Sequence, residues 1–335
     1  MDIPVTILGG YLGAGKTTLI NHLLTTSHGR RVTVLVNDFG AVNIDANLIT
    51  DRADQLIALS NGCVCCSIED DLAAAIDAQI HRTPAPEHIV IEASGVAEPA
   101  RIAGYAQNWP GLKLAAVVCV VDAETIRERA SNKFVGRVVQ RQVRAASLIV
   151  LNKIDMIDAE SLAGLSSWLD ELAPGASIVR STYGNIDPAR LLSVSDEQGA
   201  VTYATDDDDR SARFFDAVIT LPDPVDVDKL RGMLASAPPS IHRMKGFIAD
   251  AASGQTMLVQ CAGKRLSIDR YPGGETSPPL ALVLIGTERK ELELYRLRFA
   301  HVFGPQITGP HEPASGMIEP TRPSARADTR GINRT

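Results

Sequence analysis

The chain lacks an excess of basic residues, with 33 lysines and arginines against 40 aspartates and glutamates and a formal net charge of −7. This acidic balance argues against nucleic acid and anionic membrane surfaces as partners. No apolar stretch reaches 18 residues, so we expect no membrane-spanning helix. The chain begins with a strand-like run, so we expect no signal peptide.

Residues that commonly bind transition metals are scarce outside one segment. The seven histidines are scattered without paired ligand spacing, and no histidine-rich stretch occurs. There are five cysteines, but Cys63, Cys65 and Cys66 fall within four positions. Thiolates at this density can hold a divalent ion such as Zn²⁺ or Co²⁺. Clustered thiols without a secretory signal also fit a reducing cytosol, so the sequence predicts a cytoplasmic location.

The surroundings of the thiols favour their reactivity. Ser67 and the acids that follow it predict a capped helix that begins just after Cys66. A helix N-terminus lowers the pKa of a thiol and favours the thiolate, although the nearby acids oppose this in part. A redox switch, with Cys63 and Cys66 as the favoured pair, and a purely structural role are the two alternatives. Cys119 and Cys261 lie in apolar runs and are predicted to be core residues.

Residues 10–17 match the phosphate-binding pattern G-x-x-x-x-G-K-[ST] at every fixed position. A strand-like run precedes the pattern, and helical spacing over residues 16 to about 27 follows it. Glycines let backbone N–H groups approach phosphates, and the helix dipole favours the anion. Lys16 is expected to reach the β- and γ-phosphates, and the Thr17 hydroxyl is expected to bind Mg²⁺. The predicted phosphate-binding residues are Gly10, Gly13, Ala14, Gly15, Lys16, Thr17 and Thr18.

A second motif indicates which base the nucleotide carries. Residues 148–151 form an apolar run that ends in Asn152, Lys153 and, two positions later, Asp155. Guanine presents two adjacent donors on one edge, and the Asp155 carboxylate can accept from both. Asn152 would support the base, and the stem of Lys153 could cover its face. This arrangement predicts GTP rather than ATP.

Two further strand-like runs end in acidic residues. Glu92 ends residues 88–92 and is followed by Gly95, which predicts a carboxylate that acts on Mg²⁺ through water and a glycine near the γ-phosphate. Asp38 follows residues 32–36, and three roles are compatible with its position: a contact to Mg²⁺ or the attacking water, a contact to the thiol-bound metal, and a plain turn. The predicted catalytic group is Lys16, Thr17, Asp38 and Glu92.

Strand-like and helix-like segments alternate to about residue 192, and the strands read as continuous apolar runs. This pattern predicts an α/β fold, a P-loop NTPase domain with a mainly parallel sheet. At 335 residues we expect a second domain, of smaller α+β type, with helices over residues 227–235 and 288–300. The predicted boundaries are a nucleotide-binding domain with the thiol motif (1–200), an acidic linker (201–212), the α+β domain (213–303) and a disordered tail (304–335).

The order of the motifs resembles that of the CobW-like metallochaperone GTPases, relatives of the urease and hydrogenase accessory GTPases. The resemblance rests on GGYLGAGKTT, NDFG, NGCVCC, IEASGVAEP and NKID, and on RMKGF at residues 243–247. It implies slow hydrolysis of Mg²⁺·GTP to GDP, and Zn²⁺ or Co²⁺ at Cys63, Cys65 and Cys66. It also implies a client metalloprotein as partner, and a nucleotide-dependent homodimer is a further expectation.

One departure concerns the metal site. Many relatives read N-E-F-G-E where this chain reads NDFGA at residues 37–41, so a second acid is missing. Three thiolates then need a fourth donor, for which Asp38, water and a nucleotide-dependent group are the alternatives. A nucleotide-regulated metal or redox sensor is the second function hypothesis. A small-molecule P-loop kinase is disfavoured by the guanine motif.

Overall fold

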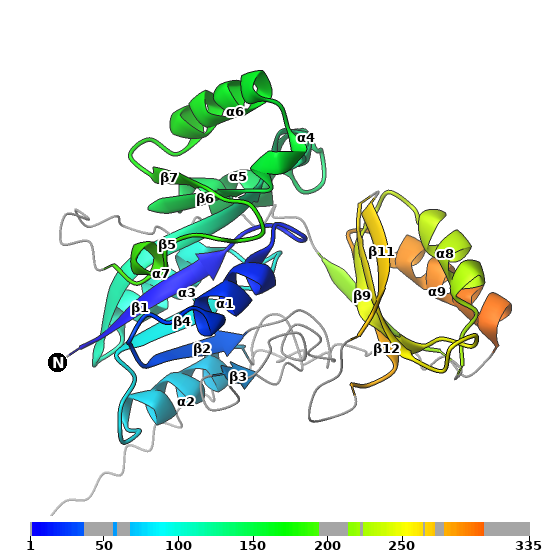
Figure 1. Cartoon of the computed structure of the whole chain (residues 1–335), viewed down its shortest axis with the longest axis horizontal. Helices are drawn as coiled ribbons and strands as arrows, with labels where there is room; N and C mark the ends of the chain where they lie inside the picture. Colours follow the sequence, from blue (N-terminus) through cyan, green and yellow to red (C-terminus); the bar gives the residue numbers. More distant parts are fainter. Residues whose placement is uncertain are drawn as a thin grey trace, which may run out of the picture.

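The computed structural model describes residues 2–36, 56–58, 68–193, 214–221, 224–263, 265–271 and 278–304. These residues form two sheets, each with its own helices (Figure 1). Several predicted features lie outside the described residues: the acidic linker, residues 305–335 of the tail, Asp38 and the three clustered cysteines. None of the described helices is long and apolar enough to cross a membrane.

The first sheet has seven strands in the order β3-β2-β4-β1-β5-β6-β7, and every pair of neighbours is parallel. Its inner strands are buried along almost their whole length because helices cover both faces. This confirms the predicted α/β class with a P-loop NTPase sheet. The strands are β1 (Ile3–Gly9), β2 (Val32–Val36), β3 (Leu56–Ala58), β4 (His88–Glu92), β5 (Leu112–Asp122), β6 (Leu148–Asn152) and β7 (Ser177–Arg180).

Alternate residues of β1 pack into the two hydrophobic cores on opposite faces of the first sheet. Leu8 packs with α1 on one face, whereas Val5 and Ile7 pack with α2 and α3 on the other. The two faces are therefore filled by period-two alternation within a strand that is apolar throughout. The helices are α1 (Lys16–Thr25), α2 (Ile68–Ile80), α3 (Pro99–Asn108), α4 (Ile126–Ser131), α5 (Gly136–Arg144), α6 (Ala159–Leu172), α7 (Pro188–Leu191) and the short 3₁₀ helix η3 (Ile154–Met156).

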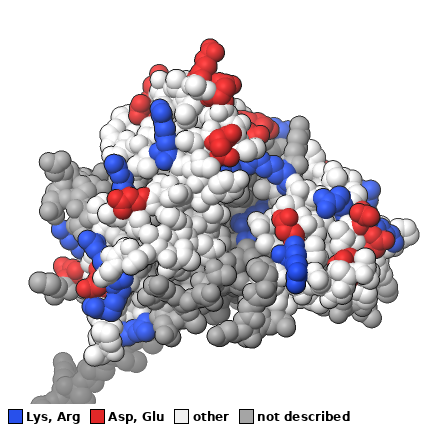
Figure 2. Space-filling model, in the orientation of Figure 1, with Lys and Arg blue, Asp and Glu red and all other residues white. Residues whose placement is uncertain are grey.

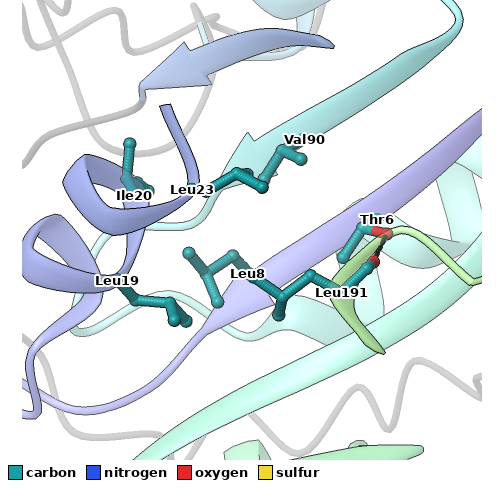
Figure 3. Close-up of a pocket in the computed structure, with 7 residues that line it drawn as sticks. All are labelled: Thr6, Leu8, Leu19, Ile20, Leu23, Val90 and Leu191. Atoms are coloured by element: carbon teal, nitrogen blue, oxygen red, sulfur yellow. Dashed lines mark hydrogen bonds between the residues drawn. The ribbon is translucent and has the colours of Figure 1, made fainter. Parts of the chain in front are cut away.

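A small apolar gap lies beneath α1 and is closed by α7 (Figure 3). The Thr6 hydroxyl donates a hydrogen bond to the Leu191 carbonyl at its edge, with an oxygen–oxygen distance of 2.8 Å. The lining is otherwise aliphatic, so the gap belongs to the packing of the core and offers no polar recognition. The lining residues are Thr6, Leu8, Leu19, Ile20, Leu23, Val90 and Leu191.

The second sheet has five antiparallel strands in the order β11-β10-β9-β12-β8 and confirms the smaller C-terminal α+β domain. Its helices pack on one face in a separate core that contains Leu230, Tyr295 and Phe299. The predicted last helix, 288–300, is observed as α9 (Arg289–Phe303). The other elements are β8 (Phe215–Thr220), α8 (Val227–Ala235), β9 (Ile241–Ala249), β10 (Thr256–Ala262), β11 (Arg265–Arg270) and β12 (Ala281–Gly286).

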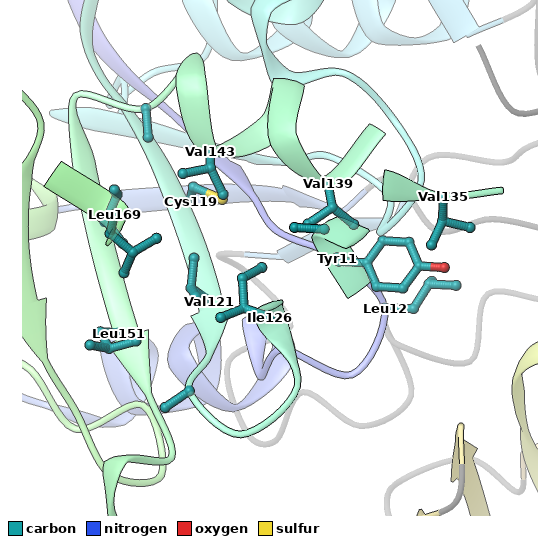
Figure 4. Close-up of a cluster of buried hydrophobic side chains, with 14 of the residues drawn as sticks. Tyr11, Leu12, Cys119, Val121, Ile126, Val135, Val139, Val143, Leu151 and Leu169 are labelled. Carbon is teal, nitrogen blue, oxygen red and sulfur yellow. The ribbon is translucent and has the colours of Figure 1, made fainter. Parts of the chain in front are cut away.

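The two domains share an apolar cluster. Phe247, Val283 and Ile285 of the second sheet belong to the same group of buried side chains as Tyr11 and Leu12 of the phosphate-binding loop. Figure 4 shows Tyr11 and Leu12 at the end of this cluster, beside the valines of α5. The C-terminal domain therefore packs at the end of the first domain that carries this loop.

Candidate nucleotide site

The loop between β1 and α1 has the backbone shape that its glycines allow. Gly10 has φ 136° and Gly15 has φ 108°, in a region that L side chains rarely adopt. A Cβ atom on Gly10 would lie 2.4 Å from the Val120 carbonyl oxygen, and one on Gly15 would lie 2.4 Å from Nδ2 of Asn152. The loop thus needs glycine for its conformation and for the close approach of its neighbours.

Lys16 begins α1, and its ammonium turns back over the loop. Its Nζ donates to the carbonyl of Gly10 at 2.9 Å, and only 5% of the residue is exposed. Thr17 is half-buried beside it, whereas Thr18 is exposed. A cation and the first N–H groups of a helix therefore meet at one point, which is a suitable place for an anion.

The predicted guanine motif contacts this loop directly. Nδ2 of Asn152 donates to the Ala14 carbonyl at 3.0 Å, and Nζ of Lys153 donates to the Gly13 carbonyl at 2.6 Å. Asp155 lies in η3 and is exposed, so its carboxylate is open to a ligand. The fold thus joins two motifs that are nearly 140 residues apart in the chain.

The segment after β7, at residues 183–184, contacts Asn152. Its role was not predicted from the sequence. The N–H of Gly184 donates to Oδ1 of Asn152 at 3.0 Å, so both ends of this side-chain amide are held. Tyr183 has a left-handed backbone with φ 54°, and 77% of it is exposed. The signal that the sequence did offer is Gly184 followed by Asn185, two residue types that favour turns, soon after the strand-like run 177–180.

Asp122 is a second residue that the sequence reasoning missed. It ends β5, and its Oδ2 accepts from Nζ of Lys153 at 2.6 Å and from Nη1 of Arg265 at 2.9 Å. Its side chain is only 12% exposed. The signal was available, because Asp122 ends an apolar run just as Glu92 does.

Glu92 and Gly95 lie beside the phosphate-binding loop, at the end of β4. Glu92 is the parallel partner of Leu8, just before the loop, and it is 3% exposed. A Cβ atom on Gly95 would lie 2.5 Å from Cδ2 of Leu12 and 3.0 Å from its backbone nitrogen. Thr17 and Glu92 together offer the hydroxyl and carboxylate oxygens that Mg²⁺ prefers, so these residues fit that ion.

Burial controls the titratable groups around the loop. Burial raises the pKa of the Tyr11 hydroxyl well above its ordinary value, and the Arg129 guanidinium, 5.7 Å from the centre of the ring, opposes this. Burial likewise raises the pKa of the Cys119 thiol to about 12, against the opposing charge of Lys16. Cys119 is therefore a neutral core thiol, which confirms its predicted structural role. Cys261 is also buried, as predicted.

The thiol motif cannot be placed in this geometry, since Asp38, Cys63, Cys65 and Cys66 are outside the described residues. Within the described ranges no group of three or more histidine, cysteine, aspartate and glutamate side chains is arranged to hold a metal ion. The transition-metal site therefore stays a prediction from the sequence.

Comparisons with known proteins find relatives that match most of this chain. The zinc chaperone CobW of a Sinorhizobium species is 30% identical over 336 residues, covering 85% of this chain and 92% of its own. The zinc chaperone YjiA of Escherichia coli is 32% identical over 322 residues, covering 89% and 98%. A crystal structure of Zn(II)-bound YjiA GTPase superposes with a TM-score of 0.44 at 26% identity, covering 90% of this chain and 99% of that one.

The family assignment follows the two domains. Residues 216–297, which span most of the five-stranded sheet and much of α9, match the cobalamin synthesis protein CobW C-terminal domain. Residues 4–180, which carry the phosphate-binding loop and the guanine motif, match the CobW/HypB/UreG nucleotide-binding domain. The chain therefore belongs to the CobW/HypB/UreG family and carries the CobW C-terminal domain.

Proposed function

We propose that this protein is a GTP-hydrolysing metallochaperone that binds Zn²⁺, Co²⁺ or a similar ion and transfers it to a client metalloprotein. The observation that carries the nucleotide part is the direct bonding of Asn152 and Lys153 to the carbonyls of Ala14 and Gly13. These bonds support the proposal because they tie the segment that carries Asp155, the proposed guanine-reading residue, to the phosphate-binding loop.

The roles of the individual residues follow from their positions. Lys16 and the N–H groups of residues 10, 13–15, 17 and 18 would hold the phosphates, with Gly95 near the γ-phosphate. Asn152, Lys153 and Asp155 would hold guanine. Thr17 and Glu92 would hold Mg²⁺, directly and through water respectively, and the ion would neutralise charge on the β- and γ-phosphates during hydrolysis. Asp38 would act on the water or on the metal.

The cargo metal is assigned from the thiols and from the relatives. Cys63, Cys65 and Cys66 supply soft donors that suit Zn²⁺ and Co²⁺. The similar proteins are described as zinc chaperones, which supports Zn²⁺ as cargo here. The metal motif lies in sequence between Asp38 and Glu92. We expect a γ-phosphate to order the segments around these two residues. GTP hydrolysis in this arrangement would release the ion to the client.

A single-turnover measurement of phosphate release tests the enzymatic part. We expect release from Mg²⁺·GTP without any acceptor, at roughly 10⁻⁴–10⁻² s⁻¹, because no stimulating arginine is identifiable from the motifs. Lys16→Ala should abolish it, with Lys113→Ala as a surface control. A rate above roughly 10 s⁻¹ for the isolated protein would contradict the expected slow hydrolysis, and a requirement for an acceptor molecule would favour a kinase.

A further inference from the structure

The turn between β10 and β11 of the C-terminal domain lies on the nucleotide-binding domain. A Cβ atom on Gly13 of the phosphate-binding loop would lie 2.9 Å from Cβ of Ala262, and one on Gly263 would lie 2.4 Å from Nη2 of Arg129. Arg129 in turn covers the ring of Tyr11 in the same loop. Figure 2 shows lysine and arginine side chains in the recess between the two lobes. The second domain thus touches the phosphate-binding loop itself.

Arg265 connects this turn to the guanine motif through one carboxylate. Nη1 of Arg265 and Nζ of Lys153 both donate to Oδ2 of Asp122, at 2.9 Å and 2.6 Å. Lys153 also donates to the carbonyl of Gly13 at 2.6 Å. Arg265 forms a second ion pair with Glu124. A continuous chain of charge-assisted contacts therefore runs from the C-terminal domain to the loop that would hold the phosphates.

We propose that Arg265 is a positioning residue for the guanine nucleotide, supplied by the C-terminal domain. The inference rests on the proposed role of Lys153 at the base. Lysine is a flexible side chain that loses rotamer freedom when it is fixed, so its place over a base depends on the acceptors that hold its ammonium. Asp122 is one such acceptor, the Gly13 carbonyl is another, and Arg265 holds Asp122. The C-terminal domain in this way sets the geometry of the base site.

Two physical effects of removing Arg265 have opposite signs. Loss of positioning would free both Asp122 and the β10–β11 turn, and nucleotide binding would weaken. Loss of the competing Arg265 guanidinium would leave Lys153 as the cation that pairs with Asp122, and this ion pair would become stronger. We expect positioning to dominate, because the guanidinium bridges two carboxylates and anchors the turn that covers Gly13.

The test is titration of full-length protein with Mg²⁺ and a fluorescent N-methylanthraniloyl GTP. We expect Arg265→Gln to weaken binding by about 5- to 20-fold, within the range of measured couplings between sites. Arg265→Lys should recover part of the loss, because it keeps the charge but not the fork. Arg270→Gln, at the exposed far end of the same strand, is the matched control and should change affinity less than about 2-fold.

A double-mutant cycle separates positioning from general structural damage. In an Asp122→Asn background, Arg265→Gln should weaken nucleotide binding clearly less than it does in the wild-type background, because the link through Asp122 to Lys153 is already broken. An additive loss in the double variant, unchanged affinity in Arg265→Gln, or tighter binding in Arg265→Gln would each overturn the inference. If the wild-type protein itself fails to bind the GTP analogue, the proposed function fails instead.

Discussion

At the scale of single residues, Asp155 is the residue that we propose chooses the nucleotide most directly. Its carboxylate is exposed at η3, and its neighbours Asn152 and Lys153 are tied to the phosphate-binding loop. A carboxylate can accept from both N1–H and the N2 amino group of guanine, whereas adenine offers no such pair of donors. We therefore expect the choice of base to depend on the exposed side chain of Asp155, next to the fixed side chains of Asn152 and Lys153.

Replacement of Asp155 by asparagine should move preference from GTP toward xanthosine triphosphate. The wild type should bind GTP at least about 100-fold more tightly than ATP, because a polar group left unpaired in a site costs a few kcal/mol. Competition of GTP, ATP and xanthosine triphosphate against a fluorescent GTP analogue measures both ratios. Equal affinity of the wild type for ATP and GTP would refute the guanine assignment.

His88 is a buried titratable residue far from any proposed chemistry. The Thr6 hydroxyl donates its one proton to the Leu191 carbonyl, so it must accept from Nε2–H of His88 at 2.9 Å. Burial, with a smaller contribution from the Arg30 charge, lowers the pKa of His88 to about 4. The imidazole is therefore neutral in the folded protein at every pH at which the protein is expected to work.

This shift makes stability depend on pH with a definite sign. Below an unfolded-state pKa of roughly 6.5 the unfolded chain binds a proton at His88 that the folded chain does not, so stability falls as pH drops toward 4. The full contribution is at most about 3 kcal/mol. Urea unfolding of the wild type and of His88→Gln at about pH 7 and about pH 4.5 tests this. His242 and the acidic residues titrate in both proteins, so their contributions to the pH dependence cancel in the comparison.

We expect the wild type to lose about 2–3 kcal/mol more than His88→Gln over this range. Glutamine can still donate to the Thr6 hydroxyl but does not titrate, so the comparison isolates the proton. Parallel losses in the two proteins would show that His88 is accessible to protonation in the folded state.

At the scale of elements, the phosphate-binding loop has a geometry that leaves little room for substitution. Gly15 has φ 108°, and a side chain there would collide with the amide of Asn152 that holds Ala14. Substitution would strain the backbone and break the link between the loop and the guanine motif together. The two motifs are thus one structural unit.

Gly15→Ala should therefore lower the free energy of unfolding by roughly 1–3 kcal/mol and abolish detectable GTP binding. Gly104→Ala is the control, since Gly104 lies inside α3 and a Cβ atom there would meet nothing within 4 Å. Alanine at that position should stabilise the helix by roughly 0.5–1 kcal/mol. Chemical unfolding and nucleotide titration of both variants test the pair, and normal GTP affinity in Gly15→Ala would place the nucleotide elsewhere.

The sequence predicted the elements that carry strong local patterns. The five-residue strand Val32–Val36 and the helix Val227–Ala235 are observed with the predicted bounds, because each combines a clear apolar pattern with clear ends. The three-residue strand Leu56–Ala58 was not predicted, since so short a run has no period of its own. The predicted first helix, 16–27, ends earlier at Thr25, where Thr26 becomes extended.

The candidate site was predictable where its residues lie in contiguous motifs. Lys16, Asn152 and Lys153 were identified in this way, and the structure brings Asn152 and Lys153 into contact with the loop. Asp122 had a local signal that was not used, since it ends an apolar run. Arg265 was missed because its importance comes from a contact with Asp122 over 143 positions, which no local pattern encodes. Pairings of this kind depend on how two domains pack, and that packing is set by apolar residues such as Phe247 and Val283.

At the scale of the whole molecule, metal binding and nucleotide binding should be separable by mutation. Cys65→Ser together with Cys66→Ser should remove tight Zn²⁺ binding, because two of the three proposed thiolates are lost. GTP binding should persist, since the loop and the guanine motif do not use these side chains. Cys119→Ser offers a matched control at a buried thiol outside the motif. Zinc titration with a chromophoric chelator distinguishes the variants, and unchanged zinc affinity in the double variant would refute the metal assignment.

The central claim is that the nucleotide controls the metal, and linkage requires that the metal controls the nucleotide equally. The most direct test is competition titration of Zn²⁺ and Co²⁺ against a chelator, with the protein in its apo form, with GDP, and with Mg²⁺ and a non-hydrolysable GTP analogue. We predict the highest metal affinity in the GTP-analogue form, by about 1–3 kcal/mol over GDP. Identical metal affinities in all three forms would contradict the claim and favour a protein whose thiols sense metal or redox state.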